Sequence, residues 1–268
     1  MHELVSFNGA IIGAKDATIG AVSSAALYGD GVFTTVAIVD SEPFLWEKHW
    51  RRLHENSGRL GIDISAITEN VVRESIEQIT TANGVSAGRA RITFFNESST
   101  GQWQSDTARN TSILITTAQR RTIPESLRLA ISPYKINSAS PLAGIKSCNY
   151  LEKFLALNEA RSSGYHEAIQ LNERGFVTSA CMANVFWLKG NELFTTPQAA
   201  GCLAGTTREF VMEQLDCSEV ECAIDELKSA DAIFLSSAGM GVVEAAEFDG
   251  ISYGRSGHRI LELAPALR

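Results

Sequence analysis

The stretch SPLAGIKSCNYLEKFLALNEA, from Ser140 to Ala160, sets one lysine between an apolar run and a helix. Asn149, followed three residues later by Glu152, has the spacing of a capping box, so a helix should begin just after Lys146. The positive end of that helix and the apolar residues before Lys146 disfavour an ammonium ion. They predict a lowered pKa and a free amine for Schiff-base chemistry. The alternative is a lysine at a strand end that reaches solvent.

Length and composition describe an ordinary folded protein. The chain has 268 residues, 44% of them hydrophobic and 20% charged, and this length favours two domains. The formal net charge is −8 and basic runs are short, so no nucleic-acid partner is expected. No apolar run approaches the roughly 20 residues of a membrane span, and the first residues lack the pattern of a secretory leader. We therefore expect a cytoplasmic protein without membrane contact, whose partner is a small molecule.

The cysteines are odd in number and scattered, without a CxxC pair. This pattern argues against a disulfide framework and against a zinc site, so no metal is expected. The five are Cys148, Cys181, Cys202, Cys217 and Cys222.

The first half of the chain contains signals for strands and two helices. SFNGAII, Ser6–Ile12, predicts two short strands joined by Asn8-Gly9, a pair that tolerates positive φ in a tight hairpin. The β-branched run Gly31–Val39 predicts a central strand. Apolar spacing predicts helices at Leu45–Leu60 and Thr68–Ala82, and further strands are expected at Ala90–Phe95 and Ser112–Thr117.

A polar segment with a proline, AQRRTIPES, separates two strand-like runs and predicts a linker. The expected organisation is an N-terminal domain of residues 1–117, a linker of residues 118–126 and a C-terminal domain of residues 127–268. The second half should contain the strands LRLAISP, HEAIQL, ANVFWLK, ELFTT, VECAI and AIFLSS, helices near Asn149–Ser162 and Thr207–Leu215, and a hairpin turn at Asp249-Gly250. This strand-rich order lacks regular βαβ alternation, so the expected class is α+β.

Two segments of the second half could bind an anion. AGCLAGTTREFV, Ala200–Val211, sets Thr206 and Thr207 at the start of a helix, where free backbone N–H groups and hydroxyls could hold a phosphate. SSAGMG, Ser236–Gly241, follows a strand and could supply a second wall of donors. The alternatives are a structural N-cap threonine and a plain turn.

The predicted helix at residues 45–60 carries three arginines, Arg51, Arg52 and Arg59. Most arginines on such a helix are solvated or paired at the surface. One that points inward would suit a phosphate dianion. Spacing alone leaves the choice among the three open.

Five motifs, in this order, resemble the fold-type IV pyridoxal-phosphate enzymes, a group of branched-chain aminotransferases, D-amino-acid aminotransferases and aminodeoxychorismate lyases. The motifs are YGDGVFTT (28–35), HWRRL (49–53), AGIKSCNYLE (143–152), GFVTSACMANVFWLKGN (175–191) and GCLAGTTREFV (201–211). The resemblance implies a two-domain α+β fold, a homodimer and bound pyridoxal 5'-phosphate. It further implies a Schiff base at Lys146 and a phosphate site formed by Arg52, Thr206 and Thr207 with help from Ser237.

Within this group, details of the motifs resemble the lyases. Aminotransferases usually have an acidic residue at the position of Thr34, and SSAGMGV lacks their usual ending. The implied reaction converts 4-amino-4-deoxychorismate to 4-aminobenzoate and pyruvate, a step of folate synthesis. Lys146 would also move the proton at the substrate carbon, and Thr35 would protonate the leaving group. The alternatives are an aminotransferase for D- or branched-chain amino acids and a cofactor-binding protein with little catalysis.

The chain departs from the family pattern at two positions. Phe95-Asn96 stand where the lyases have an Arg-Gly that contacts substrate carboxylates. Ser179 stands where the family has a glutamate that pairs with the pyridine nitrogen. A carboxylate keeps that nitrogen protonated and the ring a strong electron sink, which a hydroxyl does less well. Ser179 is therefore expected to favour elimination over transamination.

Overall fold

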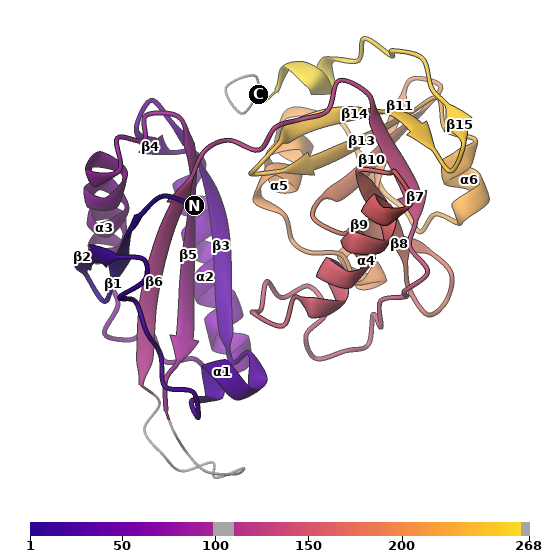
Figure 1. Cartoon of the computed structure of the whole chain (residues 1–268). Coiled ribbons are helices and arrows are strands. Elements are labelled where there is room, and N and C mark those ends of the chain that lie inside the picture. Colours follow the sequence, from indigo (N-terminus) through magenta and orange to yellow (C-terminus); the bar gives the residue numbers. More distant parts are fainter. Residues whose placement is uncertain (99–109, 264–268) are drawn as a thin grey trace. The chain divides into compact units, whose positions relative to one another are not determined.

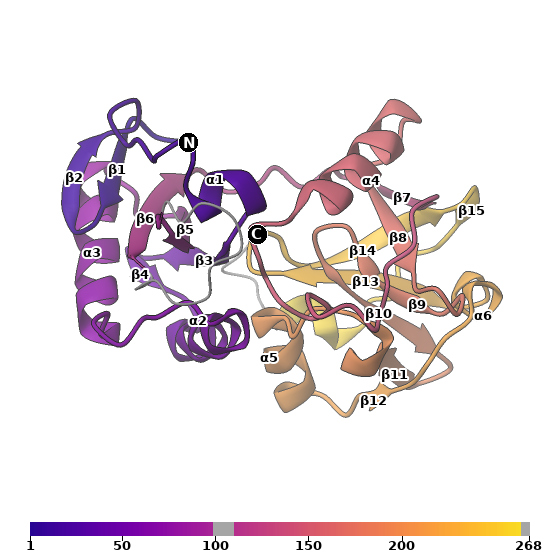
Figure 2. The same cartoon turned by 90° about the horizontal axis from the view of Figure 1, so that it is seen from below.

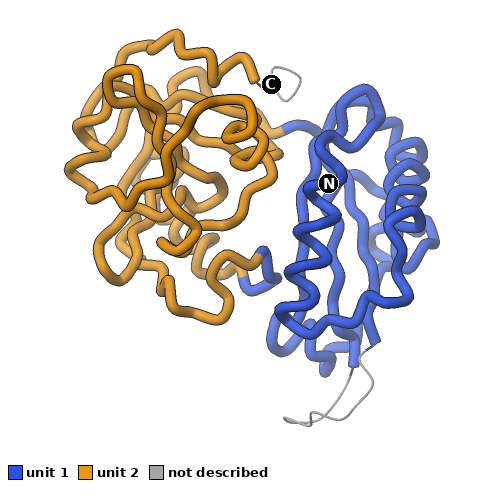
Figure 3. Tube along the Cα trace, turned by 180° about the vertical axis from the view of Figure 1, so that it is seen from behind, with its two compact units in different colours: residues 1–120, 146–149 blue, residues 121–145, 150–268 orange. Residues whose placement is uncertain are grey.

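The structure is a computed structural model that describes residues 1–98 and 110–263. The chain forms two compact units (Figure 3). Unit 1 comprises residues 1–120 together with residues 146–149, and unit 2 comprises residues 121–145 and 150–268. The lysine of the opening motif, Lys146, therefore belongs to the N-terminal unit, although the segments before residue 146 and after residue 149 belong to the other.

Unit 1 is an antiparallel sheet covered on one face by two helices (Figures 1 and 2). The strand order is β2-β1-β6-β5-β3-β4. Helices α2 and α3 pack on β3 and on β1 and β6, and bury the apolar stripes that their spacing predicted. The elements are β1 Leu4–Phe7, β2 Ala10–Gly13, α1 Ser24–Tyr28, β3 Gly31–Val39, β4 Glu42–Pro43, α2 Trp46–Leu60, α3 Glu69–Ala82, β5 Gly88–Asn96 and β6 Thr111–Ala118.

Unit 2 contains a sheet of nine strands (Figure 1). The strand order is β12-β11-β10-β13-β14-β7-β8-β9, and β15 pairs with β14. Parallel pairing of β7 with β8 and with β14 joins two antiparallel ladders. The elements are β7 Leu127–Ile131, α4 Leu151–Ser162, β8 Glu167–Leu171, β9 Val177–Ala180, β10 Asn184–Lys189, β11 Glu192–Thr195, η1 Gln198–Ala200, α5 Thr206–Gln214, β12 Ser218–Glu219, α6 Ile224–Lys228, β13 Ala232–Ser237, β14 Gly241–Phe248, β15 Ile251–Ser252 and η2 Arg259–Glu262.

The two tight hairpins predicted from sequence are confirmed. Asn8 and Gly9 connect β1 to β2 with φ of 49° and 82°, and Asp249 and Gly250 connect β14 to β15 with φ of 49° and 80°. Two consecutive residues at positive φ match the twist of the flanking strands, which explains the preference for Asn-Gly and Asp-Gly. The mixed α+β class is also confirmed.

Residues 146–149 pair with the start of β3. The N–H of Phe33 donates to the carbonyl of Lys146, and the N–H of Cys148 donates to the carbonyl of Gly31, each at 2.8 Å. The predicted capping box at Asn149 is wrong, because its side-chain amide donates instead to the carbonyl of Gly29 at 3.2 Å. Helix α4 begins two residues later, after Tyr150, without a side-chain cap.

One further prediction from sequence is wrong. VECAI, Val220–Ile224, was expected to be a strand, but only an isolated bridge joins Ala223 to Phe176, and α6 begins at Ile224. Acidic residues in the first turn favour this helix, and the Glu226 carboxylate accepts from the N–H of Ala223 at 2.9 Å. Strands β9 and β14 were not predicted, because a strand buried on both faces lacks a clear alternation.

In the described ranges no helix combines the length and apolarity needed to cross a membrane. Among the same residues, no group of three or more His, Cys, Asp and Glu side chains is arranged to hold a metal ion.

Candidate functional site

A buried polar cluster joins β3 to α2 in unit 1. The Nη2 atom of Arg52 donates to Oγ1 of Thr34 at 2.6 Å, and Oγ1 of Thr34 lies 2.7 Å from Nδ1 of His49. Because a guanidinium can only donate, the hydroxyl of Thr34 accepts from Arg52. Burial, then the positive charges of Arg52 and Lys146, hold the pKa of His49 well below its usual value. The imidazole is therefore neutral.

Helix α2 buries one of the three candidate arginines. Arg52 is 7% exposed, whereas Arg59 is exposed and the exposed Arg51 forms a surface ion pair with Glu55. The side of the helix that carries Arg52 also carries His49 and Leu53, both 1% exposed. The inward-facing arginine left open by the sequence is thus Arg52.

The side chain of Lys146 lies over an aromatic ring that it shares with an arginine. Its Nζ is 4.3 Å from the ring centroid of Phe33, and Cζ of Arg91 is 3.6 Å from the same centroid. The two cations are therefore within 7.9 Å of each other. Lys146 is half-buried and Arg91 is exposed, while Phe33 is 4% exposed. An amine and a guanidinium thus flank one buried ring.

Arg91 was not predicted as a site residue. It lies on β5 opposite Thr35 of β3, and its Nε donates to Oγ1 of Thr93 at 3.3 Å. Cross-strand neighbours share a face, so Thr35 lies on the face of Arg91 and Phe33, away from Thr34. Only strand pairing brings Arg91 to Phe33 and Lys146, and no sequence motif marks that relation.

In unit 2, the start of α5 has the character of an anion site. Gly205 occupies the N-cap without a side-chain cap, and a Cβ there would collide with Oδ1 of Asn184. Thr206 is 3% and Thr207 2% exposed. Within the described chain, the buried hydroxyl of Thr207 has no hydrogen-bond partner. A phosphate oxygen would satisfy this hydroxyl together with the helix N–H groups, so these residues fit a phosphate.

A serine on the neighbouring strand adds to this site. Ser236 is 1% exposed and lies opposite Asn184 in the β10–β13 ladder. Its hydroxyl likewise has no partner among the described residues. The sequence singled out Ser237 instead, which is half-buried at the end of β13. The alternation of a strand sends these two adjacent side chains to opposite faces.

Ser179 lies elsewhere in unit 2, on β9. It is 3% exposed and faces Gln170 of β8 across the ladder. The amide oxygen of Gln170 accepts from Nζ of Lys153 at 3.1 Å. Ser179 therefore belongs to a polar group beside α4.

All five cysteines are free thiols. Burial raises the pKa of each, to about 12 for Cys181 and Cys222 and to about 11 for Cys217. The same cause raises the pKa of Cys202, and that of Cys148 in spite of the nearby Arg91. The thiols are thus protonated at neutral pH.

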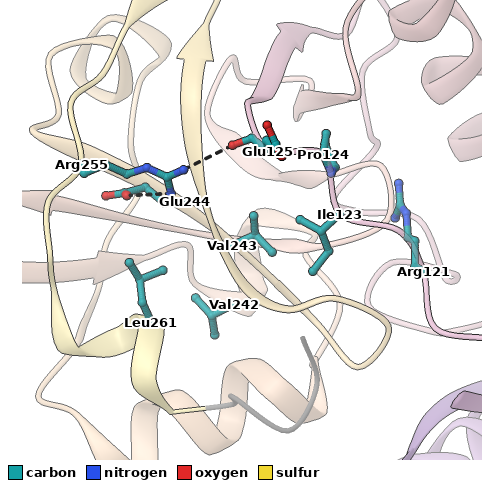
Figure 4. A pocket seen from close by; sticks show the side chains of 9 residues that line it. All are labelled: Arg121, Ile123, Pro124, Glu125, Val242, Val243, Glu244, Arg255 and Leu261. Carbon is teal, nitrogen blue, oxygen red and sulfur yellow. Dashed lines mark hydrogen bonds and ion pairs between the residues drawn. The ribbon is translucent and has the colours of Figure 1, made fainter. Parts of the chain in front are cut away.

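A pocket of about 410 Å³ opens elsewhere on unit 2 (Figure 4). Arg255 lies at its edge, donates to the carbonyl of Glu125 at 3.3 Å and lies 3.8 Å from Oε2 of Glu244. The walls are otherwise mostly apolar, formed by Ile123, Pro124, Val242, Val243 and Leu261. This pocket contains none of the site residues predicted from sequence.

Comparison with known proteins identifies the family. The family model for amino-transferase class IV matches residues 31–248. The chain belongs to this family. As a class IV member it is a pyridoxal-phosphate-dependent enzyme, which confirms the cofactor expected from sequence.

Relatives of this class IV chain have more than one activity. It is 26% identical to a putative branched-chain-amino-acid aminotransferase of Methanocaldococcus jannaschii, over 92% of this chain and 88% of the relative. It is 25% identical to the aminodeoxychorismate lyase of Bacillus subtilis, over 94% and 88%. The crystal structure of the Escherichia coli branched-chain aminotransferase superposes with a TM-score of 0.89 at 23% identity, covering 97% of this chain and 92% of that one.

The buried, neutral His49 should make stability depend on pH. Its folded-state pKa is lowered, so the unfolded chain binds the extra proton as the pH falls below about 6.5. The contribution of His49 to the free energy of unfolding should be greatest above that pH. Below it, the free energy of unfolding should decrease by at most about 1.4 kcal/mol per pH unit. Urea unfolding across this range measures the slope.

The change His49→Gln should reduce that slope. His54→Gln, the same change at an exposed histidine of α2, provides the matched control. An equal slope in wild type and His49→Gln would contradict a neutral His49.

Proposed function

We propose that this class IV enzyme is a lyase of the aminodeoxychorismate type, which converts 4-amino-4-deoxychorismate to 4-aminobenzoate and pyruvate. Lys146 would supply the amine that binds the cofactor, and Ser179 would be the residue on the side of the ring nitrogen. Bound pyridoxal phosphate supplies an electron-withdrawing ring that weakens bonds at the substrate's α-carbon. Arg52, Thr206 and Thr207 would hold its phosphate, and the buried hydroxyl of Ser236 would take the helper role that the motif resemblance implied for Ser237.

The observation that carries this proposal is the ring shared by Lys146 and Arg91. An amine and a guanidinium within 7.9 Å suit a substrate that carries both an amino group and a carboxylate, as aminodeoxychorismate does. Arg91 orients that carboxylate and thereby replaces the partner missing at Phe95-Asn96. Phe33 keeps water from the apolar side of the reacting amine.

The protein groups have separate roles in the chemistry. The Lys146 amine, once free, moves the proton at the substrate carbon, and it must be unprotonated to do so. Thr35 lies on the face of Arg91 and protonates the leaving group. Thr34 and His49 hold Arg52 in place through the hydrogen bonds of the α2 cluster.

An aminotransferase for branched-chain or D-amino acids is the second candidate. The carboxylate site at Arg91 suits an α-amino acid equally well, and relatives of the chain include enzymes of that activity. Thr34 and Ser179 favour the lyase, because the charge formed in an elimination leaves with the departing group and depends less on the ring as an electron sink.

A homodimer in the cytoplasm is part of the proposal. On α4, Leu151, Phe154 and Leu155 are 68%, 52% and 48% exposed, and their spacing sets them on one face of the helix. Such an apolar face fits a second copy of the chain. Five free thiols fit a reducing compartment.

Cofactor attachment and activity are tested together. Borohydride reduction of the purified yellow protein should leave a stable adduct on Lys146, located by peptide mass mapping. The reduced protein and Lys146→Ala should both fail to release 4-aminobenzoate from enzymatically generated aminodeoxychorismate. Release of 4-aminobenzoate by Lys146→Ala at the wild-type rate would refute the role of Lys146. Transamination of amino acids by a wild-type enzyme that releases no 4-aminobenzoate from aminodeoxychorismate would favour the aminotransferase.

The carboxylate role of Arg91 gives a second test. Arg91→Met should lower kcat/KM at least about 30-fold, since a charge-assisted contact contributes about 2 kcal/mol or more. Arg89→Met is the matched control, because Arg89 lies on the same strand and face but opposite Ala37. Equal losses in both variants would argue against a specific carboxylate contact.

The dimer is tested by sedimentation. Phe154→Glu should give a monomer at micromolar concentration, because burying a charge in an apolar interface is costly. Glu159→Lys, an exposed change on the same helix, should sediment as the wild type does. A Phe154→Glu variant that remains dimeric would show that α4 is not the contact.

A further inference from the structure

Lys153 of α4 lies over the sheet of unit 2 rather than in free solvent. Its Nζ donates to Oε1 of Gln170 at 3.1 Å, and Gln170 is 2% exposed. Burial lowers the pKa of Lys153, although Cys181, Glu167, Cys202 and Glu152 act in the opposite direction. Whether charged or neutral, an amine held by one acceptor keeps other N–H groups to donate.

Gln170 connects Lys153 to Ser179. Gln170 of β8 and Ser179 of β9 are directly opposed in the ladder, so their side chains leave on the same face about 5 Å apart. That face is the one covered by α4, where Ala156 and Leu157 pack against Ala168 and Cys181. Lys153, Gln170 and Ser179 thus form one group, which we name the donor group.

The donor group offers N–H and O–H groups. Since Nζ of Lys153 donates to Oε1 of Gln170, the amide NH₂ of Gln170 points away as a further donor. Ser179 adds a hydroxyl. No carboxylate belongs to these three described residues.

The nearest carboxylates do not share this position. Glu167 stands three residues before Gln170 on β8, so its side chain leaves the strand on the other face, although its carboxyl group still reaches Cys181 and acts on the pKa of Lys153. Its Oε2 accepts from the N–H of Met182 at 3.1 Å, and burial raises its pKa. Glu152 is exposed at the start of α4.

We propose that the donor group holds the ring nitrogen of the cofactor unprotonated, as a hydrogen-bond acceptor, and so selects elimination over transamination. This rests on the proposed function, in which Ser179 faces that nitrogen. A protonated ring would direct its N–H at donors, which is unfavourable.

The selection follows from electron demand. An unprotonated ring withdraws electrons weakly. It therefore supports transamination poorly, because that reaction needs the ring to stabilise negative charge until a proton is added at another atom. A reaction whose leaving group carries the charge away is less affected. Lys153 and Ser179 are therefore residues that determine the reaction type at the same site, in addition to the residues that hold the cofactor.

The test is ¹⁵N NMR of the holoenzyme loaded with pyridoxal phosphate labelled at the ring nitrogen. The wild-type resonance should lie at the position of an unprotonated pyridine across the neutral pH range. Lys153→Glu and Ser179→Glu, which each bring a carboxylate to the nitrogen, should shift it toward the pyridinium position and raise the ratio of transamination to elimination. Lys135→Glu, the same change at an exposed lysine of unit 2, should leave the resonance unmoved.

The outcomes separate the two proposals. A wild-type resonance at the pyridinium position would refute the proposed role of the donor group. The proposed function would still stand if borohydride reduction marks Lys146. An unmoved resonance in cofactor-loaded Ser179→Glu and Lys153→Glu also overturns it, and either variant suffices if the other does not fold. If borohydride marks no lysine and no labelled cofactor is retained, the proposed function itself fails.

Discussion

The backbone pairing of residues 146–149 with β3 is the constraint on which the candidate site depends. Two hydrogen bonds, Phe33 to Lys146 and Cys148 to Gly31, fix the lysine against a strand remote in sequence. Gly31 permits this, because a Cβ there would lie 2.8 Å from the carbonyl of Phe94 on β5 and 3.0 Å from Sγ of Cys148. The close approach of three segments therefore sets the distance between Lys146 and Arg91.

Local features of the fold were predictable, and those set by pairing between distant segments were not. Asn8-Gly9 and Asp249-Gly250 identify their hairpins because positive φ is a property of the turn residues themselves. At VECAI, apolar β-branched residues suggested a strand, but Glu226 stabilises a helix start at that point. The capping box at Asn149 failed because a backbone carbonyl more distant in sequence, that of Gly29, takes its amide.

The candidate site shows the same division. Motif resemblance named Lys146 and Arg52, and the structure buries Arg52 in a hydrogen-bonded cluster that spacing could not choose. Arg91 and Lys153 belong to no sequence motif. Arg91 is identified by its position over the ring of Phe33, and Lys153 by the strand register that places Gln170 opposite Ser179. Such residues become visible only once register assigns each side chain to a face.

The protonated thiols have a consequence for the cofactor's aldehyde. A thiolate is a strong nucleophile and would compete with the amine proposed for Lys146 at the aldehyde carbon of the cofactor. Cys148 stands only two residues from Lys146, and burial keeps its proton in place, as it does for the other four. Under the role proposed for Lys146, the packing around the sulfur atoms would suppress this competing addition without any contribution from the lysine itself.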